Sequence, residues 1–212
     1  YPRTLEKDLE LLKKKGCDVV FTPSIEDIYP QDIASEKFDF GGLENEMEGK
    51  FRVGHFDGVG TIVKALFEIV SPAHAYFGEK DFQQLQVIRK MVEKHQLPVK
   101  VIGCPIYREP HGLAMSSRNG YLTDTEKATA SAIFAEMQRL KAGIESGNTD
   151  FVQLENAMVS NLEAKGFKKD YCQVVNAATF EPANDSDKEL VLLVAMFMGK
   201  TRLIDNMQIT RD

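Results

Sequence analysis

The segment from residue 73 to residue 104 constrains the fold of this 212-residue chain more than any other part of it. Two short apolar runs, Ala73–Phe77 and Val99–Cys104, are typical of buried strands. Between them, Asp81–His95 has the apolar spacing of an amphipathic helix. Because a strand–helix–strand unit of this length joins parallel strands through a crossover, the sequence predicts a parallel sheet and an α/β fold.

The residues before this unit are predicted to supply helices and two further strands. Phe56–Val70 has a strong helical pattern. A first helix is expected between Thr4 and Gly16, with Leu5, Leu9 and Leu12 facing a core. The further strands are expected at Cys17–Phe21 and Phe38–Phe40, with a short helix at Leu43–Met47.

The residues after the unit change in character. A loop rich in polar residues is expected at Pro105–Tyr121, and a capping box of Thr123 and Glu126 opens a long helix that ends near Ala142. A second helix is predicted from Thr149 to Gly166. Three strand-like runs then follow without helices between them, which indicates an antiparallel sheet: Tyr171–Val175, Glu189–Met198 and Thr201–Ile209. We therefore expect two domains, residues 1–107 and 108–212.

The composition excludes several kinds of function. The formal net charge is −6, so a general electrostatic attraction to nucleic acid is not expected, and a phosphate ligand would need a local basic cluster. No apolar run approaches the ~20 residues of a membrane-spanning helix. The cysteines form no CxxC motif, and no two histidines have metal-ligand spacing. The sequence predicts a cytoplasmic protein without a metal site of its own and without a nucleic-acid or membrane partner.

The first candidate site is the junction at which the strand ending in Gly78 gives way to a helix. Such junctions lie at the carboxyl end of a parallel sheet, where α/β proteins bind ligands. A helix N-terminus favours phosphate, and Lys80 adds a positive charge within reach of it, beside Asp81. The alternative interpretation is a solvated turn whose charges bind nothing.

Two further segments carry groups suited to anions. Ser116, Ser117 and Arg118 offer two hydroxyls and a guanidinium in one loop, which suits a polyphosphate, although such runs also occur in plain loops. Arg52 and His55 precede a predicted helix and are expected to face one cleft. For His55 the alternative is a capping or packing role.

Several motifs together resemble one family. They are His55–Val59 (HFDGV), Phe77–Gln84 (FGEKDFQQ) and Gly112–Asn119 (GLAMSSRN), with Tyr1–Thr4 (YPRT) and Arg202–Asn206 (RLIDN) at the two ends of the chain. Their order and separation resemble the pantothenate synthetase (pantoate–β-alanine ligase) family over essentially the whole chain.

The resemblance implies a fold and a reaction. It implies an incomplete Rossmann-type parallel sheet of the HIGH-motif nucleotidyltransferase superfamily, followed by a smaller α+β C-terminal domain. The implied reaction is the ATP-dependent condensation of pantoate with β-alanine to pantothenate through a pantoyl adenylate, with release of AMP and pyrophosphate. Magnesium would accompany the ATP, and the enzyme would be a homodimer.

The resemblance also implies a role for each matching residue. Lys80 would contact the ATP phosphates, and Ser116, Ser117 and Arg118 would hold the β- and γ-phosphates as the counterpart of a KMSKS-type loop. The remaining nucleotide-binding residues would be Gly78, Asp81, Tyr107 and Met115. Gln84 would hydrogen-bond pantoate, with Arg52 and His55 near the pantoate end of the site.

The chain departs from the family pattern at its start. The Pro-Thr-Met-Gly and His-x-Gly-His motifs of the family do not occur here, and the first residue is Tyr1 rather than methionine. We therefore expect an N-terminal part of the enzyme to be missing, an uncovered sheet edge, and an inactive chain. The alternatives are another adenylate-forming nucleotidyltransferase, which an acid panel would identify, and a non-catalytic α/β binding module, which would show no ATP binding in calorimetry.

Overall fold

The computed structural model describes residues 4–29 and 34–211. By its contacts the chain divides into two compact units, with the division between Ser35 and Glu36. The first unit contains α1 (Leu5–Lys14) and α2 (Ile25–Ile28). Ser24 begins α2 with a capping box, in which its hydroxyl accepts from the backbone of Asp27, as the sequence indicates.

Two predictions for the first unit are wrong. Cys17–Phe21 forms no strand, and Val19 is 80% exposed. The leucine stripe of α1 is exposed as well, and no residue of that helix is buried. The physical reason is the same in both cases: among the described residues of this short unit, no strand pairs with the apolar run, and too few apolar side chains are present to enclose a core.

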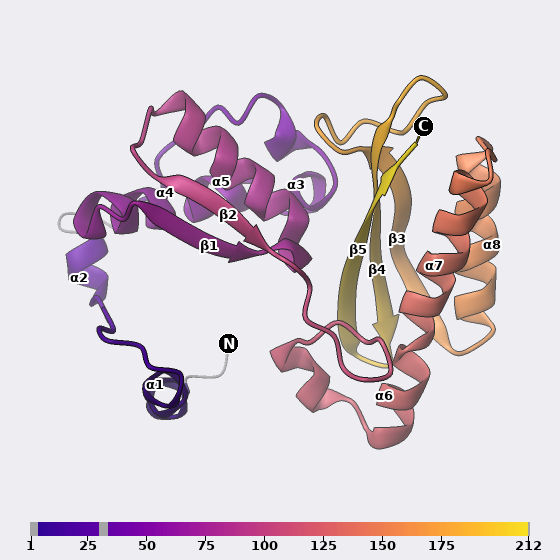
Figure 1. Cartoon of the computed structure of the whole chain (residues 1–212), viewed down its shortest axis with the longest axis horizontal. Helices are drawn as coiled ribbons and strands as arrows, with labels where there is room; N and C mark the ends of the chain where they lie inside the picture. Colours follow the sequence, from indigo (N-terminus) through magenta and orange to yellow (C-terminus); the bar gives the residue numbers. More distant parts are fainter. Residues whose placement is uncertain (1–3, 30–33, 212) are drawn as a thin grey trace. The chain divides into compact units, whose positions relative to one another are not determined.

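The second unit begins with an α/β part. Its elements in order are η1 (Leu43–Asn45), α3 (Glu48–Phe51), α4 (His55–Val70), β1 (His74–Gly78), η2 (Glu79–Asp81), α5 (Phe82–Lys94) and β2 (Lys100–Cys104). Strands β1 and β2 pair in parallel, with His74 opposite Lys100 and Gly78 opposite Cys104, and α5 connects them (Figure 1). The parallel strand–helix–strand unit is therefore confirmed.

The prediction of a strand at Phe38–Phe40 is wrong. The two rings stack on each other with centroids 5.4 Å apart, and Phe40 is fully buried. A Cβ on Gly60 of α4 would lie 3.0 Å from the Phe38 ring, so the absence of a side chain there makes room for the stack. The apolar residues in this run are buried by ring packing rather than by strand pairing.

The rest of the second unit carries an antiparallel sheet. Its elements are η3 (Ser117–Tyr121), α6 (Asp124–Ala130), α7 (Ala132–Glu145), α8 (Phe151–Glu163), β3 (Phe167–Asn176), β4 (Glu189–Met198) and β5 (Thr201–Thr210). The strand order is β3-β4-β5 with antiparallel pairing throughout, as predicted. The Thr123 capping box opens α6, but the single long helix expected here is interrupted at Ser131, whose hydroxyl donates to the carbonyl of Ala128.

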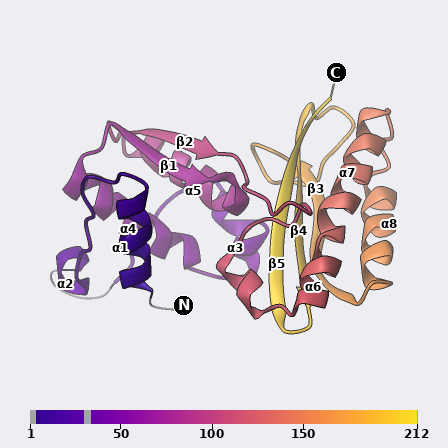
Figure 2. The ribbon, with the colours of Figure 1, turned by 60° about the horizontal axis from the view of Figure 1, so that its bottom comes forward.

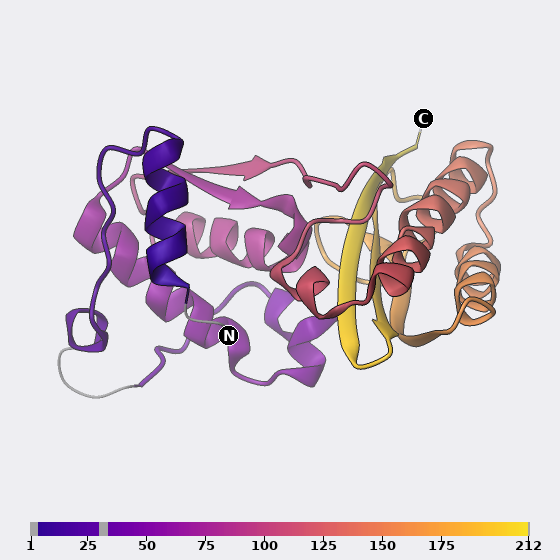
Figure 3. The same ribbon diagram turned by 90° about the horizontal axis from the view of Figure 1, so that it is seen from below.

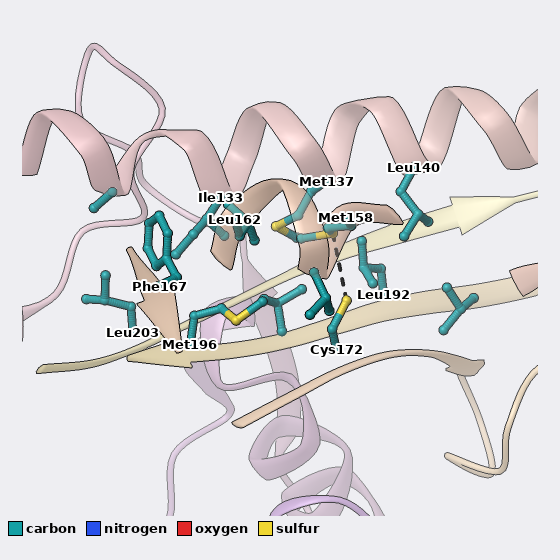
Figure 4. Packing of buried hydrophobic residues seen from close by; sticks show 14 of the residues in the cluster. Ile133, Met137, Leu140, Met158, Leu162, Phe167, Cys172, Leu192, Met196 and Leu203 are labelled. Carbon is teal, nitrogen blue, oxygen red and sulfur yellow. Dashed lines mark hydrogen bonds between the residues drawn. The ribbon is translucent and has the colours of Figure 1, made fainter. Parts of the chain in front are cut away.

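Helices α7 and α8 cover one face of this sheet, as Figures 2 and 3 show from two sides. Their apolar faces and the sheet enclose a core in which Met137, Met158 and Leu162 meet Leu192 and Met196 (Figure 4). The opposite face of the sheet belongs to a second core, shared with the α/β part, to which Val191 and Leu193 contribute.

Strand β4 is divided between the two cores. Leu190, Leu192 and Val194 lie in the helical core, whereas Val191 and Leu193 lie in the other. Because successive side chains of a strand point to opposite faces, an uninterrupted apolar run fits a strand that is buried on both sides. The α/β class and the antiparallel second sheet are confirmed, while the domain boundary at residues 107/108 stays a prediction.

No helix in the part of the chain that the structure describes has the length and apolar character needed to cross a membrane.

A buried amide organises the segment between α4 and the Phe38–Phe40 stack. The Gln83 side chain is 5% exposed, and its Nε2 donates to the carbonyls of Leu43 and Glu46 at 2.8 Å each. Its Oε1 accepts from the backbone N–H of Glu48 at 3.1 Å. One side chain at the start of α5 therefore fixes η1 and the first turn of α3.

We expect Gln83→Leu to lower the free energy of unfolding by about 2–3 kcal/mol, because it leaves these backbone groups without partners. Urea unfolding measures the effect. Gln84→Leu is the matched control, since Gln84 is only half-buried and forms no side-chain hydrogen bond to the described residues; its cost should stay below about 1 kcal/mol. Equal costs for the two variants would contradict the assignment.

Candidate active site

An open pocket lies where the start of α5 meets the β3–β5 sheet. Most of the residues proposed from sequence line it: Arg52, His55, Lys80, Asp81, Gln84 and Arg118. A narrower neighbouring pocket is lined by Lys80, Ser116 and Arg118. The two sequence segments GEKDFQQ and GLAMSSRN therefore meet at one place.

The other predicted residues lie outside both pockets. Gly78 and Ser117 line neither, and Tyr107 and Met115 are largely exposed. Tyr107 and Met115 are nevertheless adjacent, because the Met115 N–H donates to the Tyr107 carbonyl at 2.9 Å.

Lys80 is positioned by the turn η2, which follows the end of β1 directly. Its side chain is partly buried and forms no salt bridge with the described residues. Burial lowers the pKa of the Lys80 ammonium below its ordinary value; the charges of Arg118 and Arg202 act in the same direction, and those of Asp81 and Asp205 oppose them. A partly buried, unpaired cation is suited to an anionic ligand.

The turn that carries Lys80 is held by a residue from the other end of the chain. Asn206 of β5 is 4% exposed, and its Nδ2 donates to the carbonyls of Glu79 and Lys80 at 2.8 Å each. These bonds fix the backbone of the turn against the antiparallel sheet.

The preceding residue, Asp205, holds the second segment. Its carboxylate accepts two hydrogen bonds from Arg108, at 2.6 and 2.9 Å, and it is buried. Arg108 also donates to the carbonyl of Gly112 and lies over the Phe134 ring, 3.9 Å from its centroid. Gly112 has a φ of +100°, and a Cβ there would lie 2.8 Å from Phe134, so the loop requires glycine at this point.

A charged network forms another wall of the pocket. The Tyr171 hydroxyl donates to Glu48 at 2.9 Å, and Arg202 donates to Glu48 and, at 2.8 Å, to Asp170. Burial raises the pKa of the Tyr171 hydroxyl, and the Glu48 carboxylate adds to this, so the hydroxyl stays protonated. Burial and the Arg52 charge lower the pKa of His55, so its imidazole is neutral at pH 7.

Sequence reasoning assigned no role to Asp205, Asn206 or Arg202, although they stand in the RLIDN motif. A usable indication was present: an aspartate and an asparagine are adjacent within an otherwise strand-like run, where unpaired polar groups would be costly. Arg108 and Tyr171 carried no such indication, because their partners are distant in sequence.

The fold and the pocket together define an α/β protein whose pocket, between the end of a parallel sheet and an antiparallel one, has a cationic lining suited to a phosphate-containing ligand. A family model described as pantoate-beta-alanine ligase matches residues 1–208. The chain belongs to the pantoate-beta-alanine ligase family.

Curated relatives agree with this assignment. The chain is 61% identical over 212 residues to the pantothenate synthetase of Alteromonas mediterranea, covering all of this chain and 75% of the relative. It is 48% identical over 211 residues to the pantothenate synthetase of Idiomarina loihiensis, covering 99% of this chain and 75% of that protein.

Solved structures of the same family have a similar fold. Pantothenate synthetase from Thermus thermophilus matches with a TM-score of 0.89 and 39% identity, covering 98% of this chain and 75% of that one. Pantoate-beta-alanine ligase from Francisella tularensis, in complex with beta-gamma ATP and beta-alanine, matches with a TM-score of 0.76 and 34% identity, covering 98% and 70%.

The contacts of Asn206 generate a stability prediction. We expect Asn206→Ala to lower the free energy of unfolding by about 1–3 kcal/mol, since two carbonyls of partly buried residues lose their donor. Asn206→Asp keeps the shape of the side chain but loses the donors. At neutral pH it should therefore lower the free energy of unfolding by at least as much as Asn206→Ala does. It should recover part of the loss near pH 4, where a carboxyl group becomes protonated and can donate. Denaturant unfolding at the two pH values measures this, and an Asn206→Asp protein as stable as wild type at pH 7 would contradict it.

Proposed function

We propose that this protein joins pantoate to β-alanine at the pocket described above, through a pantoyl adenylate. In the first step a pantoate carboxylate oxygen attacks the α-phosphorus of ATP, and the bond to the leaving pyrophosphate breaks. In the second step the β-alanine nitrogen attacks the acyl carbon, AMP leaves, and the nitrogen loses a proton. The convergence of Lys80, Arg118 and Gln84 on one pocket is the observation that carries the proposal.

The nucleotide is proposed to bind along Lys80 and the Ser116–Arg118 segment. Lys80 stabilises the negative charge that develops at the α-phosphate, where a fixed cation in a partly desolvated site acts strongly. Ser116, Ser117 and Arg118 hold the β- and γ-phosphates. The remaining residues of the nucleotide pocket are Gly78, Asp81, Tyr107 and Met115. The shared lining of the two pockets by Lys80 and Arg118 supports this path.

Pantoate is proposed to bind at the opposite end of the pocket. Gln84, in the first turn of α5, hydrogen-bonds a pantoate hydroxyl, and Arg52 and His55 lie beside the carboxylate end. With its pKa lowered by burial and by Arg52, His55 is a neutral hydrogen-bonding group at pH 7.

Magnesium is proposed to arrive with the ATP. The described residues contain no group of three or more histidine, cysteine or carboxylate side chains arranged to hold a metal ion. Magnesium that accompanies a nucleotide is usually bound mainly by phosphate oxygens and water. The ion would neutralise phosphate charge.

The resemblance to the family further supports a cytoplasmic homodimer, with residues 1–107 as the last part of the catalytic domain and 108–212 as the C-terminal domain. The alternation of β4 side chains between two cores supports a tight association of residues 36–107 with residues 108–212.

The reaction is tested with the full gene product. We expect AMP and pyrophosphate to be released in equal amounts, with turnover only when pantoate, β-alanine and Mg-ATP are all present. A panel of other acids should give little pyrophosphate. Formation of ADP and phosphate would refute the proposal, and another acid as the preferred substrate would point to a different adenylate-forming enzyme.

Lys80→Ala separates a catalytic from a structural role. Adenylate formation should fall by about 10²–10³, as for the loss of one fixed charge-stabilising donor. The melting temperature should be unchanged or slightly raised, because burial opposes the charged form of Lys80. The variant's stability advantage should shrink as the pH rises toward 10.5, since the folded protein then loses this proton before the unfolded chain does.

Lys100→Ala is the matched control for this measurement. Lys100 lies at the other end of the same parallel sheet, is exposed, and forms no salt bridge with the described residues. Its substitution should leave adenylate formation unchanged. Near-normal pyrophosphate release by Lys80→Ala would contradict the role assigned to Lys80 in the active site.

A further inference from the structure

A second concave region lies on the outer side of Arg118. It is lined by Arg118, Tyr121, Glu126, Lys200 and Arg202, together with Met198 and Thr201. Arg118 and Arg202 also line the candidate active site, so the two regions adjoin each other. We call this second region the outer basin.

The outer basin carries an excess of positive charge. Neither Arg118 nor Lys200 forms a salt bridge with any residue in the described ranges, whereas Arg202 is paired with Glu48 and Asp170. The single carboxylate in the lining is Glu126. Its Oε2 accepts from the Thr123 backbone N–H at 2.8 Å and from the Thr123 hydroxyl at 2.9 Å.

Lys200 is held in place by the tightest turn of the sheet. It lies in the two-residue connection between β4 and β5, where Met198 is paired with Thr201. Gly199, the first residue of the turn, has a φ of +56°, while Lys200 has a negative φ, which is the pattern of a type II′ hairpin turn. The backbone of Lys200 is therefore fixed relative to Arg202, which follows on the same strand.

We propose that the outer basin binds inorganic pyrophosphate, with Lys200 and Arg118 as its cationic contacts. The inference rests on the proposed function, in which pyrophosphate is a product. Inside the active site the cations proposed to serve the phosphates are Lys80 and Arg118, and the outer basin is lined by Arg118 but not by Lys80. Two unpaired cations suit a ligand with two phosphate groups.

The arrangement gives pyrophosphate a place to move once the bond to the α-phosphorus is broken. Arg118 lines the active site, the narrower pocket and the outer basin, so it can keep contact with a phosphate during the transfer. Lys200 favours binding of free pyrophosphate in the outer basin. AMP does not compete for this place, because its single phosphate stays near Lys80. The outer basin thus separates the two products.

The test is calorimetric titration of the 212-residue chain with inorganic pyrophosphate and, separately, with AMP. We expect Lys200→Gln to weaken pyrophosphate binding about tenfold, as for one lost charge-assisted hydrogen bond, and to leave AMP binding unchanged. The matched control is Lys168→Gln. Lys168 is exposed, forms no salt bridge with described residues, and is paired with Phe197 at the same end of the sheet, but it does not line the outer basin.

Two results would overturn the inference. One is an unchanged pyrophosphate affinity in Lys200→Gln, and the other is an equal loss in Lys168→Gln, which would indicate only a general charge effect. As a second measurement, pyrophosphate should shift the backbone amide resonances of Gly199–Thr201 in wild type. These outcomes are distinct from failure of the proposed function. If the enzyme releases AMP and pyrophosphate but the titration fails, only the pyrophosphate site in the outer basin is refuted. If the titration succeeds but the enzyme forms ADP, only the proposed reaction is refuted.

Discussion

Two neighbouring side chains of β5 determine the geometry of the site. Asp205 holds Arg108, which leads into the Ser116–Arg118 segment, and Asn206 holds the turn that carries Lys80. Each of these segments alone is a loop or a turn, which by itself would sample many positions. Because both are bonded to consecutive residues of one strand, which is itself hydrogen-bonded to β4 along its length, their cations converge on one pocket. The antiparallel sheet is therefore a support for chemistry that occurs at the end of the parallel one.

The same contacts explain how the pocket stays positive in a chain with an excess of acidic residues. Of the two carboxylates that act on Lys80, Asp81 and Asp205, the second is already engaged by Arg108. Glu48, in the wall of the pocket, is engaged by Tyr171 and Arg202. A carboxylate that is satisfied by another cation neutralises less of the field at Lys80 than a free one would. Burial of Lys80 then strengthens its interaction with any anion that enters, since the local dielectric constant is lower than that of water.

Much of the fold follows from the sequence because periodicity and capping are local properties. Glu189–Met198 was predicted with its observed bounds. The predicted helix Phe56–Val70 differs from α4 by one residue at its start, and Asp81–His95 differs from α5 by one residue at each end. The wrong strands, Cys17–Phe21 and Phe38–Phe40, are apolar runs whose state depends on whether a partner strand is available, which no local pattern reveals.

The residues of the candidate site also fall into those that the sequence could predict and those that it could not. Lys80 and Arg118 were found because their motifs are contiguous in sequence. The side chains that position them were not, since Asn206 and Lys80 are 126 residues apart and Asp205 and Arg108 are 97 apart. Their pairing is decided by tertiary packing alone, so only a structure could assign them.

The division of the sheet's two faces has a consequence for how the protein tolerates insertions. Leu203 and Ile209 of β5 belong to the core under α7 and α8, so Asp205 shares their face, and Asn206 points to the opposite one. A single residue added to the Gly199–Lys200 hairpin, if absorbed by a shift of β5, would exchange these faces and present a carboxylate to the two carbonyls of the lysine turn. Surface hairpins usually accept extra residues, but this one sets the register of the strand behind the active site. In a library of loop lengths, we therefore expect no variant with an added residue at this hairpin to keep the active-site geometry.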